Sequence, residues 1–262
     1  MKFRKRLEPL QQPRSLDPRH LDSYLHIRLL DELYNGRTLS KVLLRKIKRR
    51  LRGEGENLEA AVFYNRIVVF DRPNLHGGGL SWGQDFCRVL LELGIGRCHR
   101  LFEYCAGPGY IGYSLFANGF CEELTLADIN PDAVAAARRT AQYNQVEDRV
   151  HVFCSDGLAD IPREEQWDLV VSNPPHFLQR DATDSEIRAI DPGWSVHEKF
   201  YSSIREFLRP GGRVVMQENR YGSSTADFEP MIRAGGGRIV AAHLGKSVAG
   251  VEDGLYYLVS QW

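Results

Sequence analysis

Short apolar runs alternate with segments of helical period from residue 100 to the end of the chain. The apolar runs predict strands at 100–105, 124–128, 150–156, 168–172 and 213–217, and the helical segments predict helices at 110–117, 131–143, 195–208 and 228–234. Because strands that alternate with helices form a parallel sheet with both faces covered, the pattern predicts an α/β fold with a doubly wound, mostly parallel sheet. Two last strands are predicted at 238–244 and 255–260. The loop between them is too short for a crossover helix, so one of the seven strands is expected to be antiparallel near the edge of the sheet.

The first sixty residues carry a charge pattern of their own. The whole chain has 34 Lys and Arg against 34 Asp and Glu, but residues 1–60 hold 15 basic and 8 acidic side chains, so this segment is positive and the remainder negative. Apolar residues recur every four positions between 39 and 51, with Lys and Arg between them, which predicts an amphipathic helix with a basic outer face. Such a face can contact nucleic acid or another partner, and it can equally be a solvated surface.

Between this helix and residue 100 the pattern predicts a β-hairpin from two apolar runs at 60–70 and a helix at 86–93. The segment between them contains three consecutive glycines followed by Trp82 and Gln84, and we interpret it as a gate beside a cofactor or substrate. The expected division of the chain is a basic helical segment, residues 1–58, that serves a substrate or partner, and a main domain, residues 59–262, that opens with the hairpin (59–75).

Several classes of protein do not fit the sequence. Five cysteines are scattered without a CxxC pair or a His-Cys cluster, so we expect neither a metal site nor a disulfide framework. The basic start is not followed by an apolar run of secretory type, and no stretch reaches the length of a membrane span. A reduced, cytoplasmic setting without membrane contact is therefore expected.

The stretch WDLVVSNPPHF, residues 167–177, carries the clearest chemistry. An apolar strand must stop at Asn173, because the two prolines that follow cannot continue a ladder. In an open α/β sheet, ligands bind just beyond the carboxyl ends of strands. The amide oxygen of Asn173 and the carbonyl oxygen of Pro174 are two acceptors on a stiff backbone, and the His176 ring can stack on a flat group. This set fits a planar NH₂ group, as in an amide, a guanidine or the amine of a base.

Three further loops at predicted strand ends point to a cofactor site. Gly107 and Gly109 let a backbone loop and a helix start approach a ligand closely, and Glu103 in the strand before them favours a cationic ligand group over a pyrophosphate. Asp128 ends the next strand and can bind both hydroxyls of a ribose. Asp156, in the loop after the third strand, can accept from an adenine amine or can belong to an ordinary turn.

The segments ExCAGPGYIG, LADINPDAV, SDGL and VSNPPH occur in this order, and together they resemble the successive motifs of class I S-adenosylmethionine-dependent methyltransferases, whose fold is Rossmann-like. The NPP-aromatic ending is similar to the amino-methylating branch, which includes the HemK/PrmC-type glutamine methyltransferases and the adenine-amino methyltransferases. The resemblance covers about residues 60–262. This sequence departs from the family at His176, where Tyr or Phe is usual.

The resemblance implies a role for each matching position. The cofactor S-adenosyl-L-methionine would be bound by Glu103, Cys105, Gly107, Gly109, Asp128, Ile129, Asp156, Gly157 and Asn173. The catalytic group would be Asn173, Pro174 and His176, with direct displacement of the methyl group and no metal ion. Candidate substrate contacts are Trp82, Gln84, Phe177, His197 and Glu198.

The substrate itself stays open among three hypotheses. An excess of acid between 176 and 199 favours a protein, peptide or amino-acid-like small molecule that presents a planar nitrogen. The basic segment favours an adenine- or guanine-amino methyltransferase of RNA or DNA, which must expose its base to the same site. The third hypothesis is a non-catalytic module that binds the cofactor.

Overall fold

A computed structural model of the chain describes residues 60–64, 67–71, 75, 82–178, 189–246 and 252–262. The strands are β1 (Ala60–Tyr64), β2 (Ile67–Asp71), β3 (Cys98–Tyr104), β4 (Cys121–Asp128), β5 (Val150–Cys154), β6 (Trp167–Ser172), β7 (Leu208–Asn219), β8 (Arg238–Lys246) and β9 (Glu252–Gln261). The helices are α3 (Trp82–Glu92), α4 (Tyr110–Ala117), α5 (Pro131–Asn144), α6 (Ser195–Ser203) and α7 (Thr225–Ala234), with 3-10 turns η2 (Pro192–Trp194) and η3 (Ile204–Phe207). The predicted basic helix between 39 and 51 lies outside the described residues.

Seven strands form one sheet in the order β5-β4-β3-β6-β7-β9-β8, and β9 runs antiparallel to both of its neighbours while the other pairs are parallel. The predicted α/β fold, with a mostly parallel seven-stranded sheet and one antiparallel strand next to the edge, is confirmed. The chain builds β3, β4 and β5 outward and then returns to place β6 beside β3. This reversal is a topological switch point, and it puts the loops after β3 and β6 next to each other.

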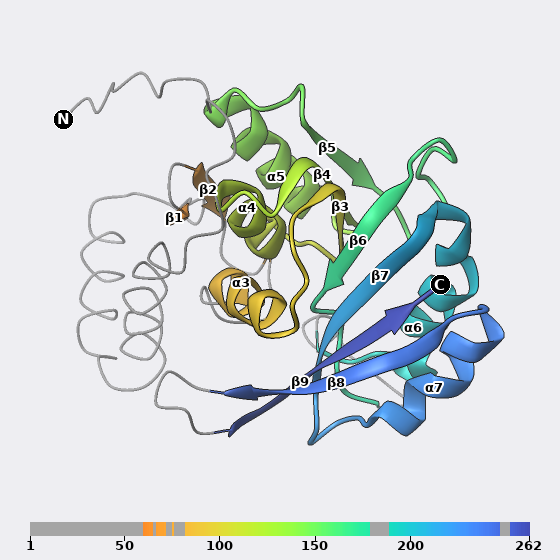
Figure 1. Cartoon of the computed structure of the whole chain (residues 1–262). Coiled ribbons are helices and arrows are strands. Elements are labelled where there is room, and N and C mark those ends of the chain that lie inside the picture. Colours follow the sequence, from red (N-terminus) through yellow and green to blue (C-terminus); the bar gives the residue numbers. More distant parts are fainter. Residues whose placement is uncertain (1–59, 65–66, 72–74, 76–81, 179–188, 247–251) are drawn as a thin grey trace.

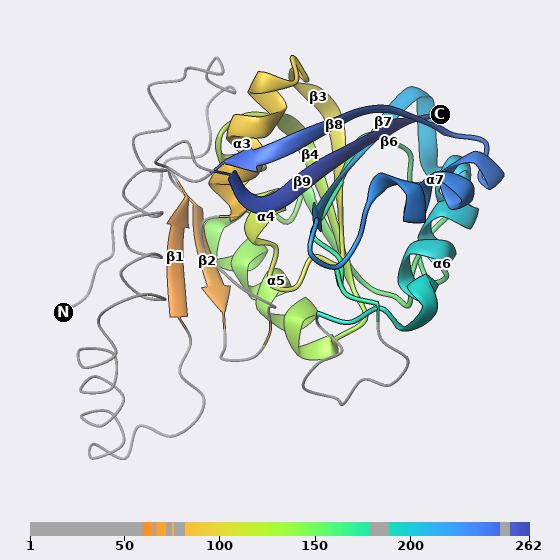
Figure 2. The ribbon, with the colours of Figure 1, turned by 90° about the horizontal axis from the view of Figure 1, so that it is seen from below.

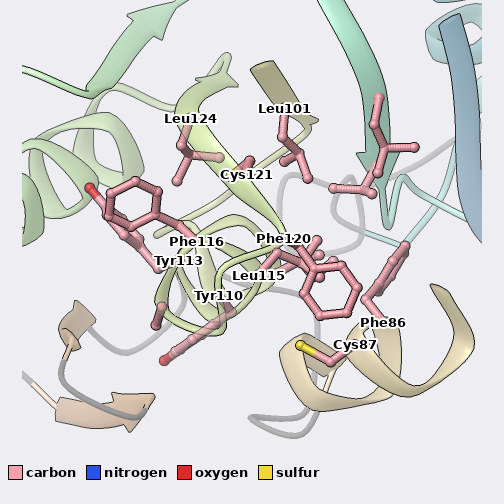
Figure 3. Close-up of a cluster of buried hydrophobic side chains, with 14 of the residues drawn as sticks. Phe86, Cys87, Leu101, Tyr110, Tyr113, Leu115, Phe116, Phe120, Cys121 and Leu124 are labelled. Atoms are coloured by element: carbon pink, nitrogen blue, oxygen red, sulfur yellow. The ribbon is translucent and has the colours of Figure 1, made fainter. Parts of the chain in front are cut away.

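Helices cover both faces of the sheet, α3, α4 and α5 on one side and α6 and α7 on the other (Figure 1, and the turned view in Figure 2). Successive strand residues point to opposite faces. The first core lies between the sheet and α3, α4 and α5, and the second lies between the sheet and α6 and α7. Leu101 of β3 therefore packs in the first core with Phe86 and Tyr113, as Figure 3 shows, whereas Phe102 packs in the second. In the second core the ring of Phe102 stacks on Trp167 with ring centroids 4.0 Å apart.

The predicted hairpin is present as β1 and β2, which pair antiparallel. It belongs to the first core, because Ile67 and Val69 are buried there. The backbone N–H of Phe70 donates to Oγ1 of Thr140 in α5 at 2.9 Å, and the Phe70 ring meets Tyr143 edge-on at 5.0 Å. The hairpin is thus fixed to the helical layer that carries α4 and α5.

Several predicted boundaries differ from the structure, three of them by more than three residues. The single helix expected over 195–208 ends at Ser203 and is followed by η3. Strand β7 begins at Leu208, which pairs with Trp167 of β6. Arg213 pairs with Leu169, so residues 209–212 form an insertion inside the strand, with Gly211 at a φ of 81°. Helix α3 begins at Trp82, before the expected start at residue 86.

Within the described residues, no helix combines the length and the apolar character that a membrane span requires.

Candidate functional site

The loop after β3, residues 105–109, is called the glycine loop, and it lies against the carboxylate of Asp128 at the end of β4. The backbone N–H of Gly107 donates to Oδ2 of Asp128 at 2.7 Å, and the N–H of Asn130 donates to Oδ1 at 2.8 Å. Burial raises the pKa of Asp128 above its ordinary value, although these N–H groups favour the charged form. Each carboxylate oxygen has a second lone pair, so Asp128 can organise the glycine loop and still accept from a ligand hydroxyl.

Residues 105–109 of the glycine loop alternate in backbone conformation, with positive φ at Cys105 (52°), Gly107 (54°) and Gly109 (86°). Cys105 has a side chain in the left-handed region, which costs roughly 1–2 kcal/mol, and its buried thiol has a pKa well above the ordinary value because of burial. A Cβ on Gly109 would lie 2.8 Å from side-chain carbons of Leu126 and Tyr113. The loop is therefore fixed in a conformation that most residues would not allow.

Glu103 lies beneath this loop and is almost completely buried. Its Oε2 atom accepts the backbone N–H of Gly112 at 2.7 Å, in the first turns of α4. Burial raises the pKa of Glu103 to about 8, even though the N–H groups of Gly112 and Ile111 oppose the shift. In the structure Glu103 thus fixes the start of α4, and its role toward a bound cofactor remains a prediction.

Two other predicted cofactor contacts lie at the ends of β4 and β5. Ile129 follows Asp128 and exposes 66% of its surface, which leaves an apolar side chain open to the flat face of a ligand. Gly157 has a φ of 66°, and the neighbouring Asp156 forms an exposed ion pair with Nζ of Lys199 at 2.7 Å. A ligand that binds the Asp156 carboxylate would compete with Lys199 for its oxygens.

The loop that follows β6, residues 173–177, is called the acceptor loop below. Hydrogen bonds connect it to the end of β3 and to the segment that begins at Ala189. Oγ of Ser172 donates to the carbonyl oxygen of Tyr104 at 2.7 Å, which links the end of β6 to the end of β3. The N–H groups of His176 and Phe177 both donate to the carbonyl oxygen of Ala189 at 2.9 Å. In this loop, Oδ1 of Asn173 is buried and has no hydrogen-bond partner among the described residues. The role of Asn173 toward an N–H donor stays a prediction.

His197 corrects an expectation. The sequence analysis places it among the candidate substrate contacts, but its side chain has no exposed surface. Its Nδ1 lies 2.7 Å from Oδ2 of Asp191, and its Nε2 lies 2.9 Å from Oε1 of Glu218. Both ring nitrogens are occupied by carboxylates, so in this structure the ring is not open to a substrate.

The remaining substrate candidates divide between described and undescribed residues. Phe177 is half-buried, with its ring edge-on to His176 at 6.3 Å, and Glu198 is exposed on α6. The backbone of Trp82 and Gln84 belongs to α3, but their side chains lie outside the described part of the structure. Most of the acidic segment near the site, residues 179–188, also lies outside it.

The sequence analysis singled out neither Glu218 nor Asp191. Glu218 follows Gln217 near the carboxyl end of β7 and has no exposed surface, and Asp191 is equally buried. A carboxylate that directly continues an apolar strand run is the pattern that points to Glu218. Its partners could not be predicted, because they come from distant segments of the chain.

The described residues contain no cluster of His, Cys, Asp or Glu suited to a metal ion.

The Rossmann-like sheet brings a glycine loop, the carboxylate of Asp128 and an Asn-Pro-Pro loop to its switch point. In open α/β sheets this is where nucleotide-type cofactors bind. The chain belongs to the methyltransferase small domain family, whose model matches residues 89–228. This match confirms the methyltransferase class that the sequence motifs predict.

Relatives and a solved structure agree with this family. Release factor glutamine methyltransferase of Clostridium acetobutylicum is 30% identical over 141 residues, which cover 49% of this chain and 50% of that protein. Ribosomal RNA small subunit methyltransferase C of Hahella chejuensis is 32% identical over 156 residues, covering 59% and 41%. The chain thus spans half or less of these relatives. SMU.776, a putative methyltransferase complexed with SAH, shares the fold with a TM-score of 0.55 at 14% identity, covering 78% of this chain and 56% of that one.

Proposed function

We propose that this protein is an S-adenosyl-L-methionine-dependent N-methyltransferase that methylates a planar nitrogen of a protein, a peptide or an amino-acid-like small molecule. The observation that carries the proposal is the buried Oδ1 atom of Asn173, which has no hydrogen-bond partner in the described part of the chain. A buried acceptor without a donor costs roughly 1–3 kcal/mol. A target N–H group that enters the site would supply the missing donor and recover that cost.

The residues around the glycine loop fit the cofactor. S-adenosyl-L-methionine supplies, when bound, a methyl group on a sulfonium sulfur. The free lone pairs of Asp128 suit the ribose hydroxyls, and the exposed side chain of Ile129 suits the face of the adenine. Gly107 and Gly109 would contact the methionine part, with Glu103 below them, and Asp156 and Gly157 would lie near the adenine.

The acceptor loop would orient the nitrogen. Oδ1 of Asn173 and the carbonyl oxygen of Pro174 would accept two N–H groups of the target, which turns its lone pair away from these oxygens and towards the methyl group. An amide or aromatic amine is a weak nucleophile, because its lone pair is delocalised. Positioning therefore supplies much of the catalysis, on the order of several kcal/mol, and hydrogen-bond acceptors on the N–H groups raise the electron density on nitrogen.

The relatives favour a protein amide as the first candidate acceptor. Release factor glutamine methyltransferase and ribosomal protein uL3 glutamine methyltransferase of Francisella tularensis are both named for methylation of a glutamine. A base amino group of RNA is the second candidate, supported by the similarity to ribosomal RNA small subunit methyltransferase C and by the basic charge of residues 1–60. Such a base would have to leave its stack to reach the site.

Incubation of the full chain with methyl-labelled S-adenosyl-L-methionine and a fractionated lysate tests the proposal. Label in protein, peptide or small-molecule fractions supports it, and label confined to RNA or DNA supports the second candidate instead. Asn173→Ala is expected to abolish transfer and to leave cofactor affinity nearly intact. Asn144→Ala, in α5 away from the site, is the matched control and should keep both transfer and affinity. Cofactor binding without transfer to any fraction would leave only a non-catalytic module.

A further inference from the structure

Four side chains form a buried cluster next to the acceptor loop, and we call His176, Asp191, His197 and Glu218 the imidazole–carboxylate cluster. His197 lies between the two carboxylates, 2.7 Å from Asp191 and 2.9 Å from Glu218. The second oxygen of Glu218, Oε2, faces Nδ1 of His176 at 3.6 Å. The cluster therefore connects β7 and α6 to the loop that would hold the methyl acceptor.

The charges in this cluster do not cancel. Each ring nitrogen of His197 faces a carboxylate oxygen, so both carry a proton and the ring is an imidazolium. Burial alone would lower the pKa of His197, but the charges and hydrogen bonds of Glu218 and Asp191 outweigh it and raise the pKa to about 9. One positive ring between two negative groups leaves one negative charge without compensation.

This excess charge lies on the Glu218 side. Asp191 accepts additional hydrogen bonds from the N–H of Val196 at 2.9 Å and from the hydroxyl of Ser195 at 3.2 Å. Oε2 of Glu218 is buried and has no hydrogen-bond partner among the described residues. Nδ1 of His176 faces it and is also buried and unpartnered there, and the hydroxyls of Tyr201 and Tyr256 are close enough to Glu218 to interact with its charge.

The facing atoms determine which nitrogen of His176 carries the proton. A lone pair on Nδ1 would point at a carboxylate oxygen, whereas an N–H there would donate to it, so the neutral ring is expected as the Nδ1–H tautomer. A separation of 3.6 Å is slightly too long for a hydrogen bond, and a shift of a few tenths of an ångström would close it. Nε2 then keeps its lone pair. The His176 side chain is 13% exposed while Nδ1 is buried, so the exposed surface belongs to the other atoms of the ring.

Building on the proposed function, we propose that Glu218 is a positioning residue that fixes the Nδ1–H tautomer of His176, so that Nε2 of His176 takes the proton that the methylated nitrogen releases. The acceptor nitrogen bonds to the methyl carbon as the carbon–sulfur bond breaks, and the sulfur keeps that electron pair. The nitrogen then gives an N–H proton to Nε2, and the N–H electron pair stays on nitrogen. The oxygens of Asn173 and Pro174 can accept hydrogen bonds but are too weakly basic to keep this proton.

The charged groups around His176 support this role. Glu218 of β7 faces the ring directly, and the ring edge of Phe177 is a neutral neighbour. Glu218 connects His197 to His176, with one carboxylate oxygen facing each ring. When Nε2 takes a proton, the ring becomes a cation that lies against the Glu218 carboxylate. A Phe or Tyr ring at this position has no basic atom, and only the imidazole adds a base.

Nuclear magnetic resonance of the full chain with ¹⁵N-labelled histidine measures the tautomer directly, with His176→Phe to assign the resonance. We expect neutral His176 to carry its proton on Nδ1 in the wild type, and Glu218→Gln to produce a mixture of tautomers. Asp191→Asn also removes one carboxylate from His197, but it leaves the Glu218 carboxylate opposite Nδ1 of His176, so it should keep the Nδ1–H form. A wild-type His176 protonated on Nε2 would overturn the proposal, and this measurement requires no methyl acceptor.

Kinetics then separate this inference from the proposed function, with the acceptor found by fractionation. General acid–base catalysis contributes about 10²–10⁴-fold, so Glu218→Gln should lower kcat by about tenfold or more without changing cofactor affinity. In a His176→Phe background the same substitution should change kcat by less than about twofold. Equal effects in both backgrounds overturn the inference while methyl transfer by the wild type keeps the proposed function. No transfer to any acceptor overturns the proposed function and the base role with it.

Discussion

Removal of the Asp128 side chain gives a prediction whose size follows from the structure. The carboxylate accepts the N–H of Gly107 at 2.7 Å and the N–H of Asn130 at 2.8 Å, and it would also bind the cofactor ribose. A hydrogen bond to a charged group contributes roughly 1.5–3 kcal/mol. Asp128→Ala removes both the hydrogen bond that fixes the glycine loop and the proposed contact with the ribose. The binding of S-adenosyl-L-methionine should therefore weaken by about 3 kcal/mol or more, which is about a hundredfold or more in Kd.

Isothermal titration calorimetry with S-adenosyl-L-methionine measures this effect. Asp128→Asn keeps a carbonyl oxygen for the N–H of Gly107, so it should lose only about tenfold. Asp132→Ala is the control, because Asp132 is an exposed carboxylate at the start of α5. Thermal unfolding shows whether each variant keeps its fold. A Kd for a folded Asp128→Ala within about threefold of the wild type would refute the assigned role of this carboxylate.

Three further predictions test the glycine loop, the acceptor loop and the core. Burial raises the pKa of Glu103 to about 8, so the stability that its protonated form contributes is complete below pH 4.5 and is lost as the pH rises through 8. In urea unfolding, Glu103→Gln should therefore be more stable than the wild type at pH 9 but not at pH 4, and parallel pH curves of the two proteins would contradict this. A Cβ on Gly222 would lie 2.5 Å from the Phe177 ring and 2.6 Å from the His176 carbonyl oxygen, so Gly222→Ala should reduce methyl transfer but not cofactor affinity, whereas Gly96→Ala, with open space around it, should change neither. Trp167→Ala removes a buried ring stacked in the second core and should cost about 3–5 kcal/mol in urea unfolding; a loss below about 1 kcal/mol would show that the core repacks around the gap.

The sheet could be predicted from the sequence because its evidence is local. Each parallel strand is a short apolar run between polar loops, and the prolines after Asn173 mark where β6 ends. Parallel strands bring their carboxyl ends to one edge of the sheet, so the sequence alone assigns the glycine loop, Asp128 and Asn173 to a common region. The boundary of β7 could not, since residues 209–212 have the composition of a helix-ending turn and are an insertion only because Trp167 and Leu169 pair on either side of them.

The buried cluster lay beyond sequence reasoning for a different reason. His197 occurs at the start of a helix, where a polar residue is usually solvated, and Asp191 occurs in a segment rich in acid. Each would be costly to bury alone, and they are buried because Glu218 arrives from β7 to complete the set. Such mutual compensation depends on the tertiary structure, so no pattern within a single segment reveals it.

The position of the methyl group on the product shows whether the Asn-Pro-Pro loop presents a nitrogen to the cofactor. Fragment mass spectrometry of the acceptor, after reaction with the wild type and with Asn173→Ala, identifies the modified atom and its dependence on this loop, with cofactor binding checked in parallel. We expect a methyl group on an amide, guanidino or amino nitrogen, and no product from Asn173→Ala. A methyl group on oxygen, sulfur or carbon, or undiminished transfer by Asn173→Ala, would contradict this expectation.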